Sequence, residues 1–138
     1  KYIIAGLDVR FTWTTSIPLW LQIVALLIAV LGYTLGTWAM VANAFFALVN
    51  RIQEDRGHVA VSDGPYRYVR HPGYIGSIAF EVATPLMLGS LWALIPGILA
   101  AGLTVVRTSF EDRILHEELV GYPDYAKQVR YRLVPGIW

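Results

Sequence analysis

Residues 64–76 read Gly-Pro-Tyr-Arg-Tyr-Val-Arg-His-Pro-Gly-Tyr-Ile-Gly and separate two long apolar segments. The turn dipeptides Gly64-Pro65 and Pro72-Gly73 bias the residue before each proline away from helix. Between them lies a cluster of Tyr and Arg side chains that ends at His71. Such a cluster supplies hydrogen bonds, positive charge and aromatic faces at one point on a membrane surface. An interfacial anchor is the simpler interpretation, since Tyr and Arg favour the headgroup zone of a bilayer.

The composition is typical of a membrane protein: 56% of the 138 residues are hydrophobic and 15% are charged. No Asp, Glu, Lys or Arg occurs from Phe11 to Asn50, and Glu81 is the only one from Pro72 to Val106. Both runs exceed the roughly 20 apolar residues that cross a hydrocarbon core. The sequence therefore predicts membrane-spanning helices on both sides of residues 64–76.

Several classes of function find no support in the composition. The chain has no cysteine, so thiol nucleophiles and thiolate metal sites are excluded. The three histidines are scattered without metal-ligand spacing, and no metal is predicted. A net charge of +1 gives no argument for a nucleic-acid partner. Because the first residue is Lys1, we expect a piece of a longer chain that lacks N-terminal helices.

We expect a single all-α integral membrane domain with about three transmembrane helices. Ser16 and Pro18 favour a helix start, and the following segment is predicted as one long helix that continues past Gly32 and Gly36. Gly89-Ser90 is predicted as the turn of a helical hairpin. The expected segments are an interfacial lead-in (1–16), a transmembrane helix (17–49), a cofactor loop (50–73), a transmembrane hairpin (74–106) and a cytosolic C-terminal segment (107–138).

The C-terminal segment is predicted to contain two helices, 107–120 and 124–129, followed by an extended interfacial tail. Asn43 is expected to bond a neighbouring helix. Of the eleven Lys and Arg, four lie between Asn50 and His71 and five between Arg107 and Arg132, while the turn at Gly89 has none. The positive-inside tendency then places both flanks of the hairpin at the cytoplasmic face.

The polar side chains gathered at that face lack a nucleophile with an adjacent base. Glu111 and Asp112 are neighbours on one helix and point in different directions, so they are no catalytic carboxylate pair. Aromatic rings and a carboxylate suit a cationic cofactor, and an arginine suits an anionic acceptor. The set therefore indicates a group transfer that depends on positioning.

The run Arg70-His71-Pro72-Gly73-Tyr74, followed by Arg107-x-x-x-Glu111 and then Gly121-Tyr122, resembles the isoprenylcysteine carboxyl methyltransferase family. Phospholipid N-methyltransferases share a looser version of this pattern. The resemblance implies a membrane enzyme that uses S-adenosyl-L-methionine in a cytosolic pocket. The acceptor would be a lipophilic small molecule or a lipidated protein that enters from the bilayer, so membrane lipids are expected neighbours, and the oligomeric state stays open.

The same resemblance implies roles for individual residues. Arg107 would bind the carboxylate of the acceptor, and no covalent enzyme intermediate is needed. A carboxylate is already ionised at pH 7, so it needs no general base, whereas an amine acceptor would need Glu111 or His71 as base. The residues expected around the cofactor are Gln53, His58, Val59, Ala60, Val61, Tyr66, His71, Pro72, Tyr74 and Glu111.

Glu81 departs from the family pattern, in which this helix is apolar. An ionisable group at that depth in a membrane is costly and is by default a functional hypothesis. We expect Glu81 to face the acceptor tunnel; the alternative is that it pairs with a polar group on a neighbouring helix, such as Asn43. For the whole chain, three alternatives stay open: phospholipid amine methylation, cofactor binding without turnover, and a non-enzymatic membrane subunit that docks a partner.

Overall fold

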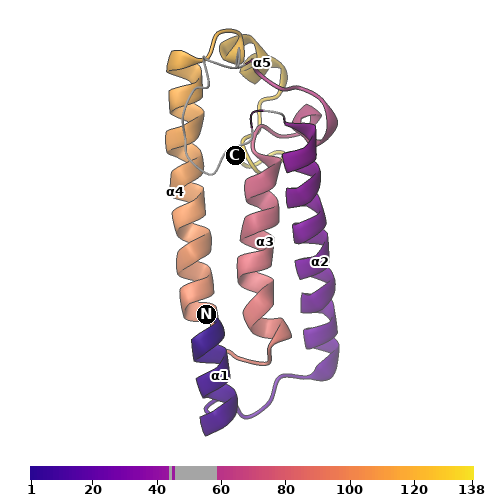
Figure 1. Ribbon diagram of the computed structural model, residues 1–138, viewed down its shortest axis with the longest axis vertical. Coiled ribbons are helices and arrows are strands. Elements are labelled where there is room, and N and C mark those ends of the chain that lie inside the picture. The colour runs from indigo at the N-terminus through magenta and orange to yellow at the C-terminus, as the bar shows by residue number, and fades with distance from the viewer. Residues whose placement is uncertain (44, 46–58) are drawn as a thin grey trace. The chain divides into compact units, whose positions relative to one another are not determined.

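The computed structural model describes residues 1–43, 45 and 59–138. All elements in this part of the chain are helical, as expected (Figure 1). The chain divides into two compact units, each described separately below. Unit 1 comprises residues 1–34 and 76–104, and unit 2 comprises residues 35–75 and 105–138.

Unit 1 opens with helix α1 (Tyr2–Phe11), which the sequence did not predict within its lead-in segment. The helix ends at Thr12, whose backbone is left-handed with φ of 51°. The buried carboxylate of Asp8 accepts hydrogen bonds from the backbone N–H and the hydroxyl of Thr14, each at 2.7 Å. It also accepts the hydroxyl of Ser90, in the turn after α3. Through these hydrogen bonds, Asp8 connects the end of α1 to the turn that follows α3.

Helix α2 (Leu19–Ala42) is a single helix that continues through Gly32 and Gly36, as predicted. It begins slightly later than expected, because the Pro18 carbonyl accepts the first helical N–H bonds, from Leu21 and Gln22. The prediction that it extends to residue 49 is wrong: α2 ends at Ala42, and residues 46–49 lie outside the described part of the chain. The side-chain oxygen of Asn43 accepts the Phe45 N–H at 2.9 Å, a local turn bond that competes with helix continuation.

The predicted hairpin is confirmed as α3 (Pro72–Met87) and α4 (Leu94–Glu118), joined by a turn at Gly89 and Ser90. Helix α3 contains Pro85 without ending there. The helix predicted over 107–120 is confirmed as far as Glu118, as the charged end of α4, which continues from its apolar part without a break. Arg107 and Glu111 thus lie on the same helix as the apolar part.

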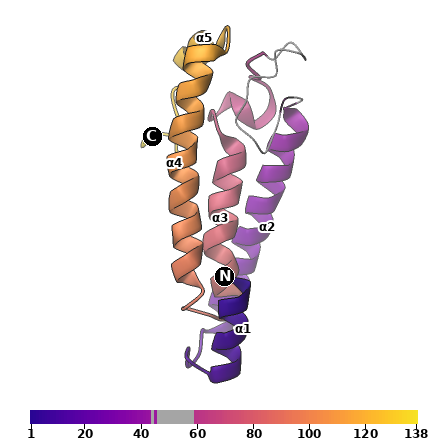
Figure 2. The same ribbon diagram turned by 60° about the vertical axis from the view of Figure 1, so that its left-hand side comes forward.

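Close backbone approaches join the helices of unit 1, whose portions of α2, α3 and α4 lie side by side (Figures 1 and 2). A Cβ atom at Gly32 would lie 2.7 Å from the Gly76 carbonyl oxygen of α3. A Cβ atom at Gly97 would lie 2.7 Å from the Glu81 carbonyl oxygen. At both places only glycine lets the helices pack this closely.

Two helices, α2 and α4, are long and apolar enough to cross a membrane, and 17% of each apolar window is buried within the protein. Most of their side chains therefore face outward, as expected for helices surrounded by lipid. Helix α3 has 16 residues. At 1.5 Å per residue that is about 24 Å, shorter than a hydrocarbon core of ~30 Å. A third span stays a prediction.

Unit 2 contains the 3-10 helix η2 (Gly64–Arg67), the start of α3, the end of α4 and the short helix α5 (Tyr122–Gln128). The expected helix near residue 124 is thus confirmed, with an earlier start. The prediction of an extended tail is wrong. Pro135 and Gly136, with φ of 83° at Gly136, form a tight turn closed by the Ile137 N–H bond to the Val134 carbonyl.

The close approach at Gly97 generates a stability prediction with a matched control in the same helix. Gly97→Ala is expected to lower the unfolding temperature, because the new methyl group meets a backbone oxygen. Gly102→Ala is the control, since nothing lies within 4 Å of its Cβ position. It is expected to keep or raise stability through helix propensity, by up to ~1 kcal/mol. Thermal unfolding in detergent compares the two; equal effects would refute the assigned packing.

Candidate active site

Arg70 and His71 are held in place by backbone hydrogen bonds to the C-terminal segment. The Arg70 N–H donates to the Tyr131 carbonyl and the His71 N–H to the Arg132 carbonyl, both at 2.9 Å. Pro72 follows as the first residue of α3, where its missing N–H costs nothing. The polar segment before α3 is therefore ordered by residues about 60 positions later in the chain.

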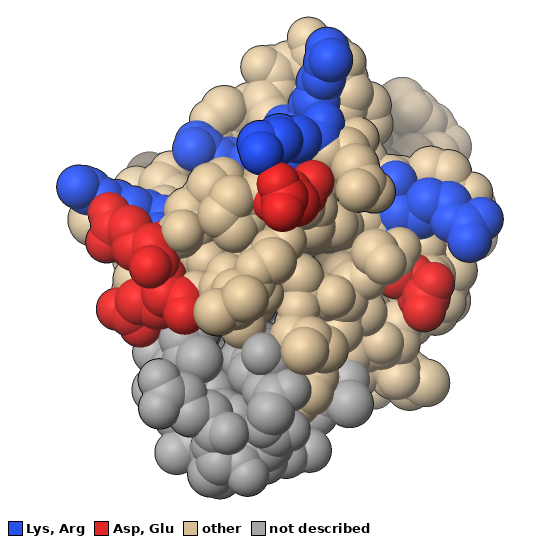
Figure 3. Space-filling view, turned by 90° about the horizontal axis from the view of Figure 1, so that it is seen from above, with Lys and Arg blue, Asp and Glu red and all other residues tan. Residues whose placement is uncertain are grey.

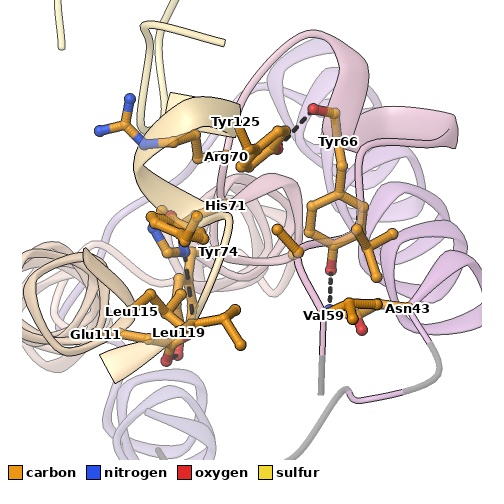
Figure 4. A pocket seen from close by; sticks show the side chains of 14 residues that line it. Asn43, Val59, Tyr66, Arg70, His71, Tyr74, Glu111, Leu115, Leu119 and Tyr125 are labelled. Atoms are coloured by element: carbon orange, nitrogen blue, oxygen red, sulfur yellow. Dashed lines mark hydrogen bonds and ion pairs between the residues drawn. The ribbon is translucent and has the colours of Figure 1, made fainter. Parts of the chain in front are cut away.

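A cavity of about 90 Å³ lies in unit 2 beside these residues (Figure 4). Tyr66 and Asn43 lie on one side of it, and His71, Tyr74 and Glu111 lie on the other. Its described lining consists of Asn43, Val59, Ala60, Val61, Tyr66, Arg70, His71, Gly73, Tyr74, Glu111, Leu115, Leu119, Tyr122 and Tyr125.

Most of the side chains that the sequence singled out for the cofactor meet at this cavity. Pro72 is buried next to the cavity and does not line it. Gln53 and His58 lie outside the described residues. The predicted residues that line the cavity are Val59, Ala60, Val61, Tyr66, His71, Tyr74 and Glu111.

Tyr74 and Glu111 join the two predicted motifs directly. The Tyr74 hydroxyl donates to Glu111 Oε2 at 2.5 Å across a separation of 37 residues. His71 stacks on Tyr74 with ring centroids 5.9 Å apart, and its Nδ1 lies 3.8 Å from Glu111 Oε1. Glu111 keeps 24% of its side chain exposed, so its carboxylate is available to a ligand in the cavity.

Arg107 lies one helical turn before Glu111 and is not among the residues that line the cavity. Its guanidinium is 5.7 Å from the centroid of the Tyr74 ring, a cation–π contact. The residue as a whole is exposed. The same tyrosine therefore contacts the arginine through its ring and the carboxylate through its hydroxyl.

Tyr66 is anchored on the other side of the cavity by three hydrogen bonds. Its hydroxyl donates to the Ala39 carbonyl at 3.3 Å and accepts the Asn43 amide at 3.4 Å. Its own carbonyl accepts the Tyr125 hydroxyl at 2.7 Å. Burial raises the pKa of the Tyr66 hydroxyl, so it stays protonated. Asn43 was expected to bond a neighbouring helix, and it bonds the 3-10 helix η2.

Asp112 organises this region, and the sequence did not assign it a role. Arg70 donates to it through two nitrogens, Nε to Oδ1 at 2.8 Å and Nη2 to Oδ2 at 3.1 Å. Arg132 Nε and the Tyr122 hydroxyl donate to it at 2.8 and 2.9 Å, and His71 Nε2 lies 3.1 Å away. The side chains of Arg70 and Asp112 are 7% and 1% exposed. This is a fully buried, bidentate ion pair with further donors around it.

The remaining donors and charges near Asp112 complete the network. Arg70 Nη1 donates to the carbonyls of Val129 and Arg130 at 2.9 and 2.8 Å. Burial alone would lower the pKa of Arg70, but the Asp112 carboxylate raises that pKa above its ordinary value. Burial, followed by the charge of Asp112, raises the pKa of Tyr122. Arg70 is therefore charged and Tyr122 neutral over the physiological pH range.

Glu81 belongs to unit 1 and does not line the cavity. Its Oε2 is 2.8 Å from Nζ of Lys1, whose side chain is 8% exposed. The alternative, in which Glu81 pairs with a polar group on a neighbouring helix, is borne out, with Lys1 at the start of α1 as the partner in place of Asn43. The placement of Glu81 in an acceptor tunnel stays a prediction without a contact that supports it.

Sequence reasoning missed Asp112, Tyr122 and Tyr125 as parts of the site. Gly121-Tyr122 was part of the resemblance, but no signal showed that these hydroxyls point inward. Arg70 offered a signal, because an arginine two residues before the apolar helix α3 at a membrane surface needs an anionic partner. Asp112 was one of several acidic residues on its helix, and only the fold selects among them.

The chemistry of the lining suits an organic cation. Four tyrosines and the Glu111 carboxylate surround the cavity, which matches the preference of a positively charged sulfur for aromatic faces and a counter-charge. No cluster of His, Asp and Glu that could hold a metal ion occurs in the described ranges 1–43 and 59–138. The lining thus fits a sulfonium cofactor by the type of its side chains.

The Asp112 network generates a stability prediction. Asp112→Asn is expected to cost about 3 to 5 kcal/mol of unfolding free energy, because it leaves the Arg70 charge buried without a counter-ion. Glu117→Gln is the control: it breaks the Arg113–Glu117 pair, which is 75% and 60% exposed. A surface pair contributes at most ~1 kcal/mol. Denaturant unfolding measures both, and a small loss for Asp112→Asn would show that Arg70 finds other compensation.

Two proteins that carry the same name are similar in sequence to this chain. A protein-S-isoprenylcysteine O-methyltransferase from Schizosaccharomyces pombe is 33% identical over 111 residues, covering 78% of this chain and 45% of its own length. The Mus musculus enzyme of the same name is 35% identical over 118 residues, covering 80% and 40%. The chain spans about half the length of the curated relatives it matches.

A solved structure of the eukaryotic intramembrane Ras methyltransferase ICMT has the same fold. Its TM-score is 0.77 at 24% identity, and the match covers 99% of this chain and 50% of that one. The model of the isoprenylcysteine carboxyl methyltransferase family matches residues 23–119, which include the start of α3, Arg107 and Glu111. The chain therefore belongs to the isoprenylcysteine carboxyl methyltransferase (ICMT) family of integral membrane proteins.

Proposed function

We propose that this chain carries the methyl-transfer site of an S-adenosyl-L-methionine-dependent enzyme whose acceptor is the carboxylate of an isoprenylcysteine, as a lipophilic small molecule or on a lipidated protein. The observation that carries the proposal is the Tyr74–Glu111 bond at the cavity. It brings the Arg-His-Pro-Gly-Tyr run and the Arg-x-x-x-Glu pair together, as one site for two reactants requires. Family membership supports the same reaction.

When bound, S-adenosyl-L-methionine supplies an electrophilic methyl group on a positively charged sulfur. Glu111 would hold this cationic cofactor with the aromatic faces of Tyr66 and Tyr74 and the backbone of residues 59–61, and His71 would orient Glu111. Gln53 and His58 remain proposed contacts from outside the described residues. The cavity of about 90 Å³ is smaller than the ~300 Å³ of a typical ligand pocket, so binding requires lining side chains to move.

Arg107 would bind the acceptor carboxylate in a bidentate manner. Its contact with the Tyr74 ring holds the guanidinium beside the hydroxyl that bonds Glu111. Arg107 and Glu111 would therefore hold the two reactants beside the same tyrosine. Because a carboxylate is ionised at pH 7, the residues need only align it and remove its water.

We further propose that this site faces the cytoplasm and that residues 1–138 form one methyltransferase domain with additional helices upstream. The charge asymmetry of the sequence supports the orientation. The length of the relatives supports the additional helices, since the chain covers 45 to 57% of the first relatives compared. Neither phospholipid amine methylation nor a docking role finds support in these relatives, which share one name.

A binding measurement tests the cofactor assignment. Tyr74→Phe removes the hydroxyl that holds Glu111 and is expected to weaken S-adenosylhomocysteine binding about tenfold, the usual effect of a hydrogen bond to a charged group. Glu111→Gln is expected to weaken S-adenosyl-L-methionine more than S-adenosylhomocysteine, because only the former carries a sulfonium charge. Calorimetry in detergent measures both ligands on the parent and the variants.

Glu117→Gln is the matched control for Glu111, since it neutralises an exposed carboxylate on the same helix. It is expected to bind both ligands as the parent does. An equal loss of ligand binding in Glu111→Gln and Glu117→Gln would contradict the assignment of Glu111 to the cofactor. If the parent chain binds neither ligand, the same variants are measured in a longer chain that includes the upstream helices, and unchanged binding there would refute the proposal.

The acceptor assignment is tested separately with Arg107→Gln. We expect a rise in KM for a prenylated cysteine of at least tenfold with little change in cofactor affinity, because a charge-assisted bidentate contact is lost. Steady-state kinetics with a prenylcysteine and its amide analogue check the result. If the parent methylates the amide analogue as well as the acid, Arg107 does not read a carboxylate.

A further inference from the structure

A second hollow in unit 2 is not used by the proposed reaction. It encloses about 410 Å³ and shares only Arg70 with the cavity described above. Three arginines and three large apolar or aromatic side chains line it, namely Arg70, Arg130, Tyr131, Arg132, Ile137 and Trp138.

The floor of this hollow is the C-terminal turn. The Trp138 carbonyl accepts the N–H groups of Arg132, Leu133 and Val134, each at 3.1 Å. The Arg132 guanidinium lies 5.0 Å from the Trp138 ring centroid and donates through Nε to Asp112. The turn is therefore a built structure with fixed positions for its arginines.

The depth of the turn in the membrane follows from its backbone contacts. Tyr131 and Arg132 pair with Arg70 and His71, the two residues that precede the apolar helix α3. On α4, charged residues resume at Arg107 after an apolar segment. The turn thus lies where apolar helices leave the hydrocarbon, which is the level of lipid headgroups.

The hollow carries excess positive charge. Among the described residues, Asp112 is the side-chain carboxylate that contacts arginines of this hollow, namely Arg70 and Arg132. It offsets one of the three positive side-chain charges. Arg130 is exposed, and its side chain has no ion pair within the part of the chain that the structure describes. Seen from this end of the molecule, basic side chains project at several places around the face (Figure 3).

Exposed apolar side chains stand next to this charge. Ile137 is 81% exposed and Val134 is 45% exposed, both on the same tight turn. A free phosphate would leave these side chains in water. A phospholipid would contact both the charged and the apolar side chains, with its headgroup beside the arginines and its acyl chains beside Ile137 and Val134.

We propose that this hollow binds the headgroup of an anionic phospholipid, with Arg130 and Arg132 holding the phosphate and Ile137 and Val134 entering the acyl boundary. The site would hold residues 130–138, and with them the Asp112 network, at the membrane surface. It does not depend on the methyl-transfer reaction and can be tested without it.

The test is competition between lipids on the full chain. Native mass spectrometry is performed after release from micelles that contain equal amounts of phosphatidylglycerol and phosphatidylcholine. The parent is expected to retain phosphatidylglycerol severalfold in excess. Arg130→Gln is expected to reduce that preference about fivefold, which corresponds to ~1 kcal/mol for one basic residue near an anionic surface. Because the Arg130 side chain is exposed, the substitution is expected to leave the fold intact, and circular dichroism checks this.

Arg113→Gln is the matched control, since it removes an arginine that is 75% exposed and paired with Glu117. It is expected to keep the parent preference. A parent without preference, or an equal loss in both variants, would overturn the proposal. Displacement of the lipid by millimolar inorganic phosphate would also overturn it, because the hollow would then select a free anion. Brominated phosphatidylglycerol is expected to quench a smaller share of the tryptophan fluorescence in Trp138→Phe than in the parent, and an equal share would contradict the proposal.

Discussion

The buried ion pair between Arg70 and Asp112 is the interaction on which unit 2 depends. Removing two charges from water is costly, and their attraction compensates only when the geometry is good and the remaining donors and acceptors are satisfied. Here both carboxylate oxygens accept from Arg70, and Arg132, Tyr122 and His71 surround the same group. The pair therefore constrains the loop before α3, the end of α4, α5 and the C-terminal segment together.

The separation of structural and chemical carboxylates follows from helix geometry. Glu111 and Asp112 are adjacent on α4, so their side chains leave the helix about 100° apart. Asp112 points to Arg70 and is 1% exposed, whereas Glu111 points to Tyr74 and remains 24% exposed at the cavity. One carboxylate is fully occupied by bonds that hold the fold, and the other keeps an exposed part at the cavity, where we propose that it holds a cationic ligand. Two neighbouring acidic residues thus serve different purposes without competing.

Membrane proteins place polar networks where backbone and side-chain groups leave the hydrocarbon, and this chain does so at one end of α3. Three features lie close to Pro72. They are the polar loop before α3, the Arg70–Asp112 ion pair and the C-terminal turn. In unit 1, by contrast, glycines at positions 32 and 97 allow close helix contact, and the Lys1–Glu81 pair neutralises the one charge of α3. The cavity, the second hollow and the Asp112 network therefore all belong to unit 2, whereas the Asp8 network and the close glycine contacts belong to unit 1.

Much of this architecture was predictable from sequence because it follows from local rules. Apolar run length located α2 and the hairpin, turn dipeptides located the ends of the polar loop, and the spacing of Arg107 and Glu111 placed both on one helix face. The resemblance supplied seven of the residues that line the cavity. Those properties depend on neighbours in the chain, or on a motif that stays intact within it.

The partners of the charged groups could not be predicted, because pairing depends on which distant segments the fold brings together. Asp112 was one of several acids on its helix, and nothing local distinguished it until Arg70 and Arg132 met it. Lys1 and Glu81 are separated by most of unit 1, and the tail was expected to be extended until Trp138 bonded back to Arg132. Local patterns specify the helices, whereas burial of charge, which decides the network, exists only once the helices have packed.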